Sequence, residues 1–238
     1  MKLCSIIPRI FKRVKYAAAF ITVVLYLLSI PVLIIASEDK SFSRVVLDFN
    51  GPVLRSGIPS PWKLRINKGE AYARIVADGG EPALHLRSSS ASFSLERDLR
   101  LKTSDYPYLN WTWKALAIPP NGDLRIGSQN DQVLQLMIAF EGGRVLSYVW
   151  DSNAPEGTVS DESIGIPLFI TVKVMVVKSG TSERGKWLQI TRNLYQDYKS
   201  VFKEKPRNIR GIRVQTNSQY TGELTEGLVR QIIFSQNK

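Results

Sequence analysis

The chain has 238 residues and a formal net charge of +11, with one cysteine, Cys4, and one histidine, His85. One cysteine and one histidine are too few for a zinc site. His85 alternates with two leucines, which makes it a solvated strand residue in preference to a catalytic base. The sequence contains no phosphate loop and no dinucleotide fingerprint. After the N-terminal segment, no run of Lys and Arg is dense enough to predict binding to nucleic acid.

The N-terminal segment predicts export. Residues 1–15 carry five basic residues and no acid, and residues 16–36 form an uncharged, mostly apolar run of 21 residues. At about 1.5 Å per residue, this run is long enough to span a bilayer core of about 30 Å. Because a basic flank stays in the cytoplasm, we expect the rest of the chain to be periplasmic or extracellular. A membrane anchor and a cleaved signal peptide both fit this pattern, and a buried core helix fits it less well.

Residues 37–238 predict a single all-β domain. Short runs rich in strand-forming residues alternate with Gly, Pro, Asn, Asp and Ser. Their spacing is typical of a jelly-roll-like antiparallel β-sandwich. We expect strands at 44–49, 62–66, 71–77, 83–87, 92–99, 109–116, 133–140, 144–150, 169–177, 187–191, 209–215 and 228–235.

The segment 194–203 departs from this strand pattern. Leu194, Tyr198 and Phe202 recur every four residues there, which predicts a short amphipathic helix at the edge of the sandwich. Arg192 and Asp197 flank the junction between the preceding strand and this helix. We expect them to form a structural ion pair.

The strand at 109–116 indicates which face it buries. Leu109, Trp111, Trp113 and Ala115 alternate there with three polar residues. Because successive side chains of a strand point to opposite faces, both tryptophans lie on the apolar face. This favours a place in the core over a place on a binding surface.

The strand at 133–140 is apolar on both faces, which predicts a central position covered on both sides. A jelly roll with a concave groove provides such cover. Gln135 is a lone polar side chain in one of the apolar rows. It either hydrogen-bonds inside the core or points into a ligand groove, and the first is the more common arrangement of a buried amide.

Five sequence elements, in chain order, resemble one family: YLNWTWK, SQNDQVLQLMIAF, LSYVWDSNAPEGT, VVKSG…GKWLQITRNLYQDYKSVF and GIRVQTNSQYTGE. The family is the bacterial domain of unknown function 3047, and the resemblance covers nearly all of residues 37–238. Its most specific parts are YVW and the run W-x4-RN-x3-DY-x3-F. The resemblance implies an exported β-sandwich of the carbohydrate-binding type, with no assigned activity.

The chain departs from the family pattern at three places. The pattern has paired acids before the central strand, where this chain has Asn130 and Asp131. It has an arginine at the position of Gln135, and an acid-rich turn where this chain has Asn217 and Gln219. If the family binds a cation or performs acid–base chemistry there, this chain lacks charges for it.

An aromatic groove is one expected form of a binding site. In the strand at 144–150, Tyr148 and Trp150 share one face. An aromatic surface beside polar amides stacks on sugar rings, while an aromatic core is the alternative. If a groove exists, we expect Tyr148, Trp150, Asp131 and Gln135 to line it, with Trp113 near one end.

The loop after that strand is a candidate calcium site. Asp151, Asn153 and Asp161, with Glu156 and Glu162 near them, offer the oxygen ligands that calcium takes. The EF-hand spacing is absent, and a solvated acidic loop is the alternative. We expect no other cofactor.

Binding is better supported than catalysis. A glycosidase needs two carboxylates about 5–10 Å apart across a groove, and no acids here have a signature spacing. Without residues 1–36 the net charge falls from +11 to +6. Such a surplus favours anionic glycans, lipid headgroups or nucleic acid, but more often it only keeps a surface soluble. The leading hypothesis is an exported or membrane-anchored, non-catalytic binding domain for a carbohydrate or another envelope component. A polysaccharide-active enzyme and a structural or protein-interaction domain are the alternatives.

Overall fold

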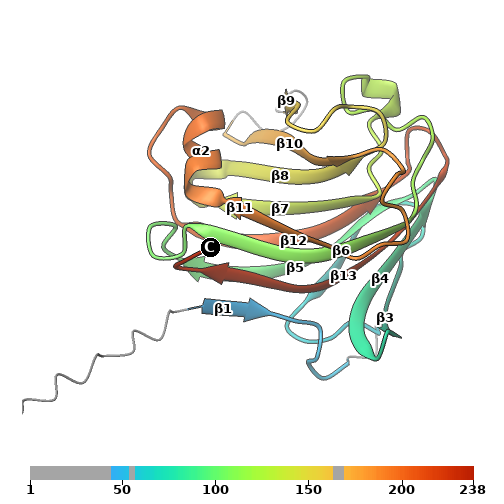
Figure 1. Cartoon of the computed structure of the whole chain (residues 1–238), viewed down its shortest axis with the longest axis horizontal. Helices are drawn as coiled ribbons and strands as arrows, with labels where there is room; N and C mark the ends of the chain where they lie inside the picture. The colour runs from blue at the N-terminus through green and yellow to red at the C-terminus, as the bar shows by residue number, and fades with distance from the viewer. Residues whose placement is uncertain (1–43, 54–56, 163–168) are drawn as a thin grey trace, which may run out of the picture. The chain divides into compact units, whose positions relative to one another are not determined.

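Figure 1 shows a computed structural model of the chain, which describes residues 44–53, 57–162 and 169–238. Phe42–Lys238 forms one compact unit. The expected basic flank, the apolar run at 16–36 and the domain boundary after residue 36 lie outside the described residues. Within the described ranges, no helix is long and apolar enough to cross a membrane.

Two β-sheets form the fold (Figure 1). The first sheet contains, in spatial order, β11 (Leu188–Asn193), β6 (Tyr108–Ala117), β13 (Leu224–Ser235), β4 (Glu81–Ser89) and β3 (Tyr72–Asp78), with β1 (Arg44–Leu47) also paired to β13. The second contains β2 (Lys63–Lys68), β5 (Ser92–Leu101), β12 (Ile209–Asn217), β7 (Leu134–Phe140), β8 (Arg144–Asp151), β10 (Thr171–Ser179) and β9 (Val159–Asp161). β8 and β10 run parallel, because the chain passes through β9 on the far side of β10 before it enters β10.

The prediction of an all-β, jelly-roll-like sandwich is confirmed. Each predicted strand overlaps an observed one. β9 was not predicted, since its three residues are too few to show an alternating pattern. Several observed strands are longer than predicted, because main-chain pairing continues into polar residues that the pattern had assigned to turns.

The core lies between the two sheets and takes the apolar rows of both. Trp111 and Trp113 from β6 meet Tyr148 and Trp150 from β8, and all four side chains are buried. Ring centroids are 5.3 Å apart for Trp111 and Tyr148, and 6.0 Å apart for Trp113 and Trp150. Such pairs contribute about 0.5–1.5 kcal/mol each beyond the area that they bury. The prediction that both tryptophans of β6 are core residues is confirmed.

α2 (Leu194–Phe202) is the expected edge helix (Figure 1). Asn193 caps its start, where the side-chain oxygen accepts a hydrogen bond from the backbone N–H of Gln196 at 3.0 Å. Tyr198 is buried and packs edge-to-face on Phe140, with ring centroids 4.8 Å apart. The helix therefore covers one end of the core beside β7.

Candidate functional site

The seven-stranded sheet turns one face away from the core, and the strand register decides which side chains share that face. One row crosses the sheet through Glu96, Arg213, Met137, Ser147 and Val174. The next row crosses it through Asp98, Gly211, Ala139, Val145 and Val172. Charged side chains therefore stand on β5 and β12, next to apolar ones on β7, β8 and β10.

Loops cover one end of this outward face. Leu124, from the loop between β6 and β7, and Ala154, from the loop after β8, pack on Val149, Val174 and Val176 in a second, smaller apolar cluster. All five side chains are buried. The central strands are thus covered on both faces at this end, and the outward face is open at the other.

The open end is a groove of about 430 Å³. The volume lies within the range of about 300–1,000 Å³ that is usual for small-molecule sites. The apolar side of the groove is formed by Met137, Ala139, Val145, Ile170 and Val172. The charged side is formed by Glu96, Arg97, Asp98, Arg210 and Arg213. Such a groove suits a ligand that has one apolar face and hydrogen-bonding edges.

Ion pairs hold most of the charged side in place. Arg213 and Arg65 both pair with Glu96. Lys63 Nζ lies 3.0 Å from Asp98 Oδ2. Of the charged side chains of the groove, Glu96 and Arg213 are therefore oriented before any ligand arrives, whereas the Lys63–Asp98 pair is exposed.

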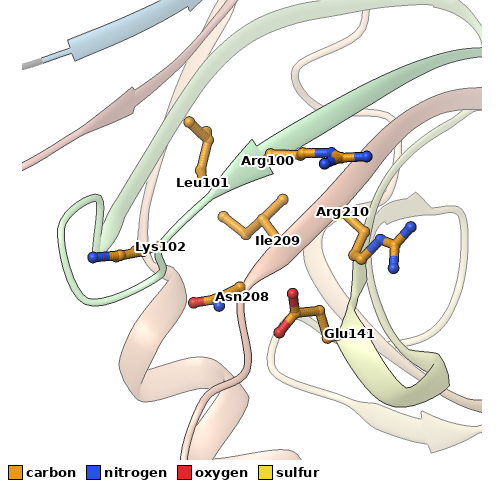
Figure 2. Close-up of a pocket in the computed structure, with 7 residues that line it drawn as sticks. All are labelled: Arg100, Leu101, Lys102, Glu141, Asn208, Ile209 and Arg210. Carbon is orange, nitrogen blue, oxygen red and sulfur yellow. The ribbon is translucent and has the colours of Figure 1, made fainter.

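A second pocket, of about 300 Å³, adjoins the groove and shares Arg210 with it. Figure 2 shows this pocket between the end of β5 and the start of β12. It is lined by Arg100, Leu101, Lys102, Glu141, Asn208, Ile209 and Arg210. Three cations thus share the pocket with one acid.

A network of side-chain amides lies on the sheet away from the groove. Gln135 Nε2 donates hydrogen bonds to Gln132 Oε1 at 2.9 Å and to Asn217 Oδ1 at 2.6 Å. Gln132 Nε2 donates to Asn130 Oδ1 at 2.6 Å, and Asn130 Nδ2 donates to Glu162 Oε1 at 2.9 Å. Burial raises the pKa of Glu162. Gln135 is therefore hydrogen-bonded internally, as is usual for a buried amide.

Asp131 fastens the turn between β12 and β13. Its buried carboxylate accepts hydrogen bonds from the backbone N–H groups of Tyr220 and Thr221, and from the Thr221 hydroxyl. The distances for these bonds run from 2.6 to 3.3 Å. Asp131 therefore serves the structure of this turn and does not line the groove.

The three departures from the family pattern meet in this network. Asn217 Nδ2 donates to Asp131 Oδ1 at 3.0 Å and to the carbonyl oxygen of Asn130 at 2.8 Å, while its own Oδ1 accepts from Gln135. Gln219 lies in the same turn, where its carbonyl oxygen accepts from Lys68 Nζ at 3.2 Å. An arginine among acids would form an ion cluster here. The amide side chains of this chain form hydrogen bonds at these positions but do not carry the charges of the family pattern.

Trp113, Tyr148 and Trp150 do not line the groove, which corrects the expectation of an aromatic site. Their side chains are at most 1% exposed and face the opposite sheet. β8 is apolar on both faces, so its alternation did not show which face turns outward. The structure places the larger, aromatic row inside, where it buries more area.

The expected calcium ligands have separate partners. Both carboxylate oxygens of Asp151 accept backbone N–H groups, at 2.7 to 3.0 Å. Asn153 Nδ2 donates to two backbone carbonyls, and Asp161 pairs with Lys173 at 2.6 Å. Among the residues that the structure describes, no three Asp, Glu, His or Cys side chains form a group that could hold a metal ion.

Arg192 and Asp197 form an ion pair with two hydrogen bonds. Arg192 Nε donates to Asp197 Oδ2 at 2.8 Å, and Arg192 Nη2 donates to Oδ1 at 2.7 Å. Tyr148 Oη donates to the same Oδ2 at 2.8 Å. Burial raises the pKa of Tyr148 well above its ordinary value, so the phenol stays protonated as a donor.

The charged lining of the groove and pocket is what sequence reasoning missed. Glu96, Asp98 and Arg100 alternate along β5, which is a visible signal for a charged outward face. Their neighbours on β12, Arg210 and Arg213, come from a distant part of the chain. Pairing between two such segments cannot be predicted from either segment alone.

The fold is similar to that of several solved structures, at low identity. The Family 11 carbohydrate-binding module of cellulosomal cellulase Lic26A-Cel5E of Clostridium thermocellum has 12% identity and a TM-score of 0.42, over 81% of this chain and 94% of that chain. The xyloglucanase domain of NopAA from Sinorhizobium fredii has 9% identity and a TM-score of 0.47, over 82% and 97%. Endoglucanase cel12A from Rhodothermus marinus has 7% identity and a TM-score of 0.44, over 82% and 99%. At these values the similarity says nothing about what this chain binds or does.

No functionally curated protein matches the sequence. A family model described as "Protein of unknown function (DUF3047)" matches residues 60–233. The match runs from before β2 into β13, and so includes the groove, the pocket and the amide network. Because it spans well over half of the sequence, the chain belongs to the DUF3047 family.

Proposed function

We propose that the protein is a non-catalytic binding domain that holds a carbohydrate chain in the groove of its seven-stranded sheet. The composition of the groove carries this proposal. Apolar side chains from β7, β8 and β10 lie beside charged side chains on β5 and β12, of which Glu96 and Arg213 are held by an ion pair. A sugar ring has an apolar face of C–H groups and a rim of hydroxyl groups, which match these two sides.

The fixed charges support recognition of hydroxyl groups. The exposed carboxylate of Asp98 keeps lone pairs free for hydroxyl donors, and Arg213 has N–H groups beyond those that face Glu96. Because an ion pair already holds Glu96 and Arg213, a ligand orders few additional rotamers of these two side chains when it binds. A hydrogen bond to a charged group contributes about 1.5–3 kcal/mol.

The placement of the acids supports binding over catalysis. Glu96 and Asp98 belong to the same strand, β5, on one side of the groove, so they do not face each other across it. Each also has a cation as a partner. Glu162, whose pKa is raised by burial, accepts a hydrogen bond from Asn130 in the amide network and does not line the groove. Two carboxylates that face each other, as glycosidic chemistry requires, are therefore not found in the described lining of the groove.

We place this function outside the cytoplasm. The support is the basic flank of residues 1–15 and the apolar run at 16–36, which together are typical of an exported or membrane-anchored chain. The partner is then a glycan of the cell envelope or of the surroundings.

Glycan binding by the full chain, with the groove open or blocked, tests the proposal. Ala139→Trp adds a large ring to the apolar side of the groove. Ala77→Trp adds the same ring at an exposed position of β3 in the other sheet. Loss of binding in the first variant alone supports the groove, and equal binding by both variants contradicts it.

A further inference from the structure

The pocket beside the groove carries charge that the fold does not use. Arg100, Lys102 and Arg210 line it and are exposed, with Glu141 as the single acid. Within the described part of the chain, none of the three cations has an ion pair or a side-chain hydrogen bond to another protein group. Arg213 in the neighbouring groove, by contrast, is paired with an acid. The lining of this pocket therefore carries a local excess of positive charge.

The arrangement of the three cations favours an anion. Figure 2 shows the guanidinium groups of Arg100 and Arg210 on one side of the pocket and the ammonium group of Lys102 on the other. Unpaired like charges around one hollow raise the positive potential there and attract an anionic group. A guanidinium presents two parallel N–H donors, which fit two oxygens of a carboxylate or a phosphate.

We infer that this pocket binds the anionic group of an acidic glycan, either a uronic acid carboxylate or a phosphate ester. The inference rests on the proposed function, because Arg210 lines both the pocket and the groove and so joins a charged unit to the sugar chain beside it. Arg100, Lys102 and Arg210 contribute to the lining of a recess of about 300 Å³, which accommodates one unit of a polymer. A lipid surface would need cations that project from a plane.

The test measures binding of the full chain in detergent to polygalacturonate, phosphomannan and dextran. Binding to phosphatidylglycerol vesicles is measured after the detergent has been removed. Arg100→Gln removes a guanidinium that lines the pocket but not the groove. Arg87→Gln removes an exposed guanidinium from β4 in the other sheet and is the matched control. We expect one acidic polymer to bind, Arg100→Gln to weaken it at least about tenfold, and Arg87→Gln to change it less than about twofold.

The two acidic polymers distinguish a carboxylate from a phosphate. Salt provides a second readout: at about 1 M, where the Debye length is about 3 Å, binding of the acidic polymer should fall. Equal melting temperatures of the parent and both arginine variants, as expected for exposed side chains, exclude misfolding as the cause of any loss.

Three outcomes would overturn the inference. In the first, dextran binds as tightly as the acidic polymers, and its binding is unchanged by Arg100→Gln but lost in Ala139→Trp. The groove proposal then stands and the anionic pocket does not. If no polymer binds, both proposals fail. If only vesicles bind, and Arg100→Gln abolishes that binding, the pocket recognises lipid headgroups instead of a glycan.

Discussion

Tyr148 Oη donates a hydrogen bond of 2.8 Å to Asp197 Oδ2, from the seven-stranded sheet to α2. The same carboxylate accepts two hydrogen bonds from Arg192, which lies on β11 of the other sheet. One side chain therefore joins the helix to both sheets. Asp197 is buried, so its loss would leave a cation and a phenol without their acceptor in a place that water reaches poorly.

Asp197→Asn should destabilise the fold. The amide offers Arg192 and Tyr148 a weaker, uncharged acceptor, and we expect the free energy of unfolding to fall by about 1.5–3 kcal/mol. Tyr148→Phe removes only the neutral donor and should lower it by about 0.5–1.5 kcal/mol. Urea unfolding of the three proteins measures both changes. An Asp197→Asn variant as stable as the parent would show that the ion pair adds nothing.

The amide network predicts a coupled pair of substitutions. Gln135→Arg alone places a charge next to Asn217 at a buried position and should destabilise the protein by about 3 kcal/mol or more. Adding Asn217→Asp gives that charge a partner, as the family resemblance implies. We expect a coupling free energy of about 0.5–3 kcal/mol in favour of the double variant. A double-mutant cycle measured by urea unfolding checks this, and simple additivity would rule it out.

Glu162 predicts a dependence of stability on pH. Burial raises its pKa, so the folded chain binds a proton there more tightly than the unfolded chain does. Its contribution to stability is therefore lost as pH rises from the ordinary value of 4.5 through the raised pKa. Glu162→Gln keeps an acceptor for Asn130 but cannot ionise.

We therefore expect the Glu162→Gln variant to be more stable than the parent at neutral pH, with a difference that shrinks as pH falls toward 4.5. Urea unfolding across this pH range measures the difference. A variant less stable than the parent at neutral pH would mean that the charged form is favoured in the folded state.

The loop from Asp151 to Asp161 predicts little response to calcium. Its carboxylates are engaged by backbone N–H groups and by Lys173, and do not converge on one point. We expect added calcium, or a chelator, to move the melting temperature by less than about 1 °C. A ligand at about 100 times its Kd would add about 2.7 kcal/mol, or roughly 5–11 °C at 2–4 °C per kcal/mol. A shift of that size would assign the loop as a calcium site.

The sequence predicts the strands well because alternation is a local property. Leu109, Trp111 and Trp113 identify the buried face of β6, since the other face of that strand is polar. The same argument cannot be applied to β8, because both of its faces are apolar. Which face of β8 is buried, and so the burial of Tyr148 and Trp150, depends on the partner sheet. The aromatic groove was wrong for this reason.

The site depends on contacts that no single segment contains. Gln135 meets Asn217 because β7 pairs with β12, and Arg210 joins the end of β5 through another pairing of β12. The family resemblance singled out Gln135 and Asn217 but not their contact. By contrast, Arg192 and Asp197 are only five residues apart in the sequence, so their ion pair could be predicted from one local segment.

Binding isotherms of the full chain against neutral and acidic polysaccharides test the central claim most directly. The parent, Ala139→Trp and Ala77→Trp are compared under the same conditions. We expect the parent and Ala77→Trp to bind the same polysaccharide with similar Kd, and Ala139→Trp to bind it at least about tenfold more weakly, a difference of about 1.4 kcal/mol. If no polysaccharide binds the parent, or if Ala139→Trp binds as tightly as the parent, the groove is not a glycan site.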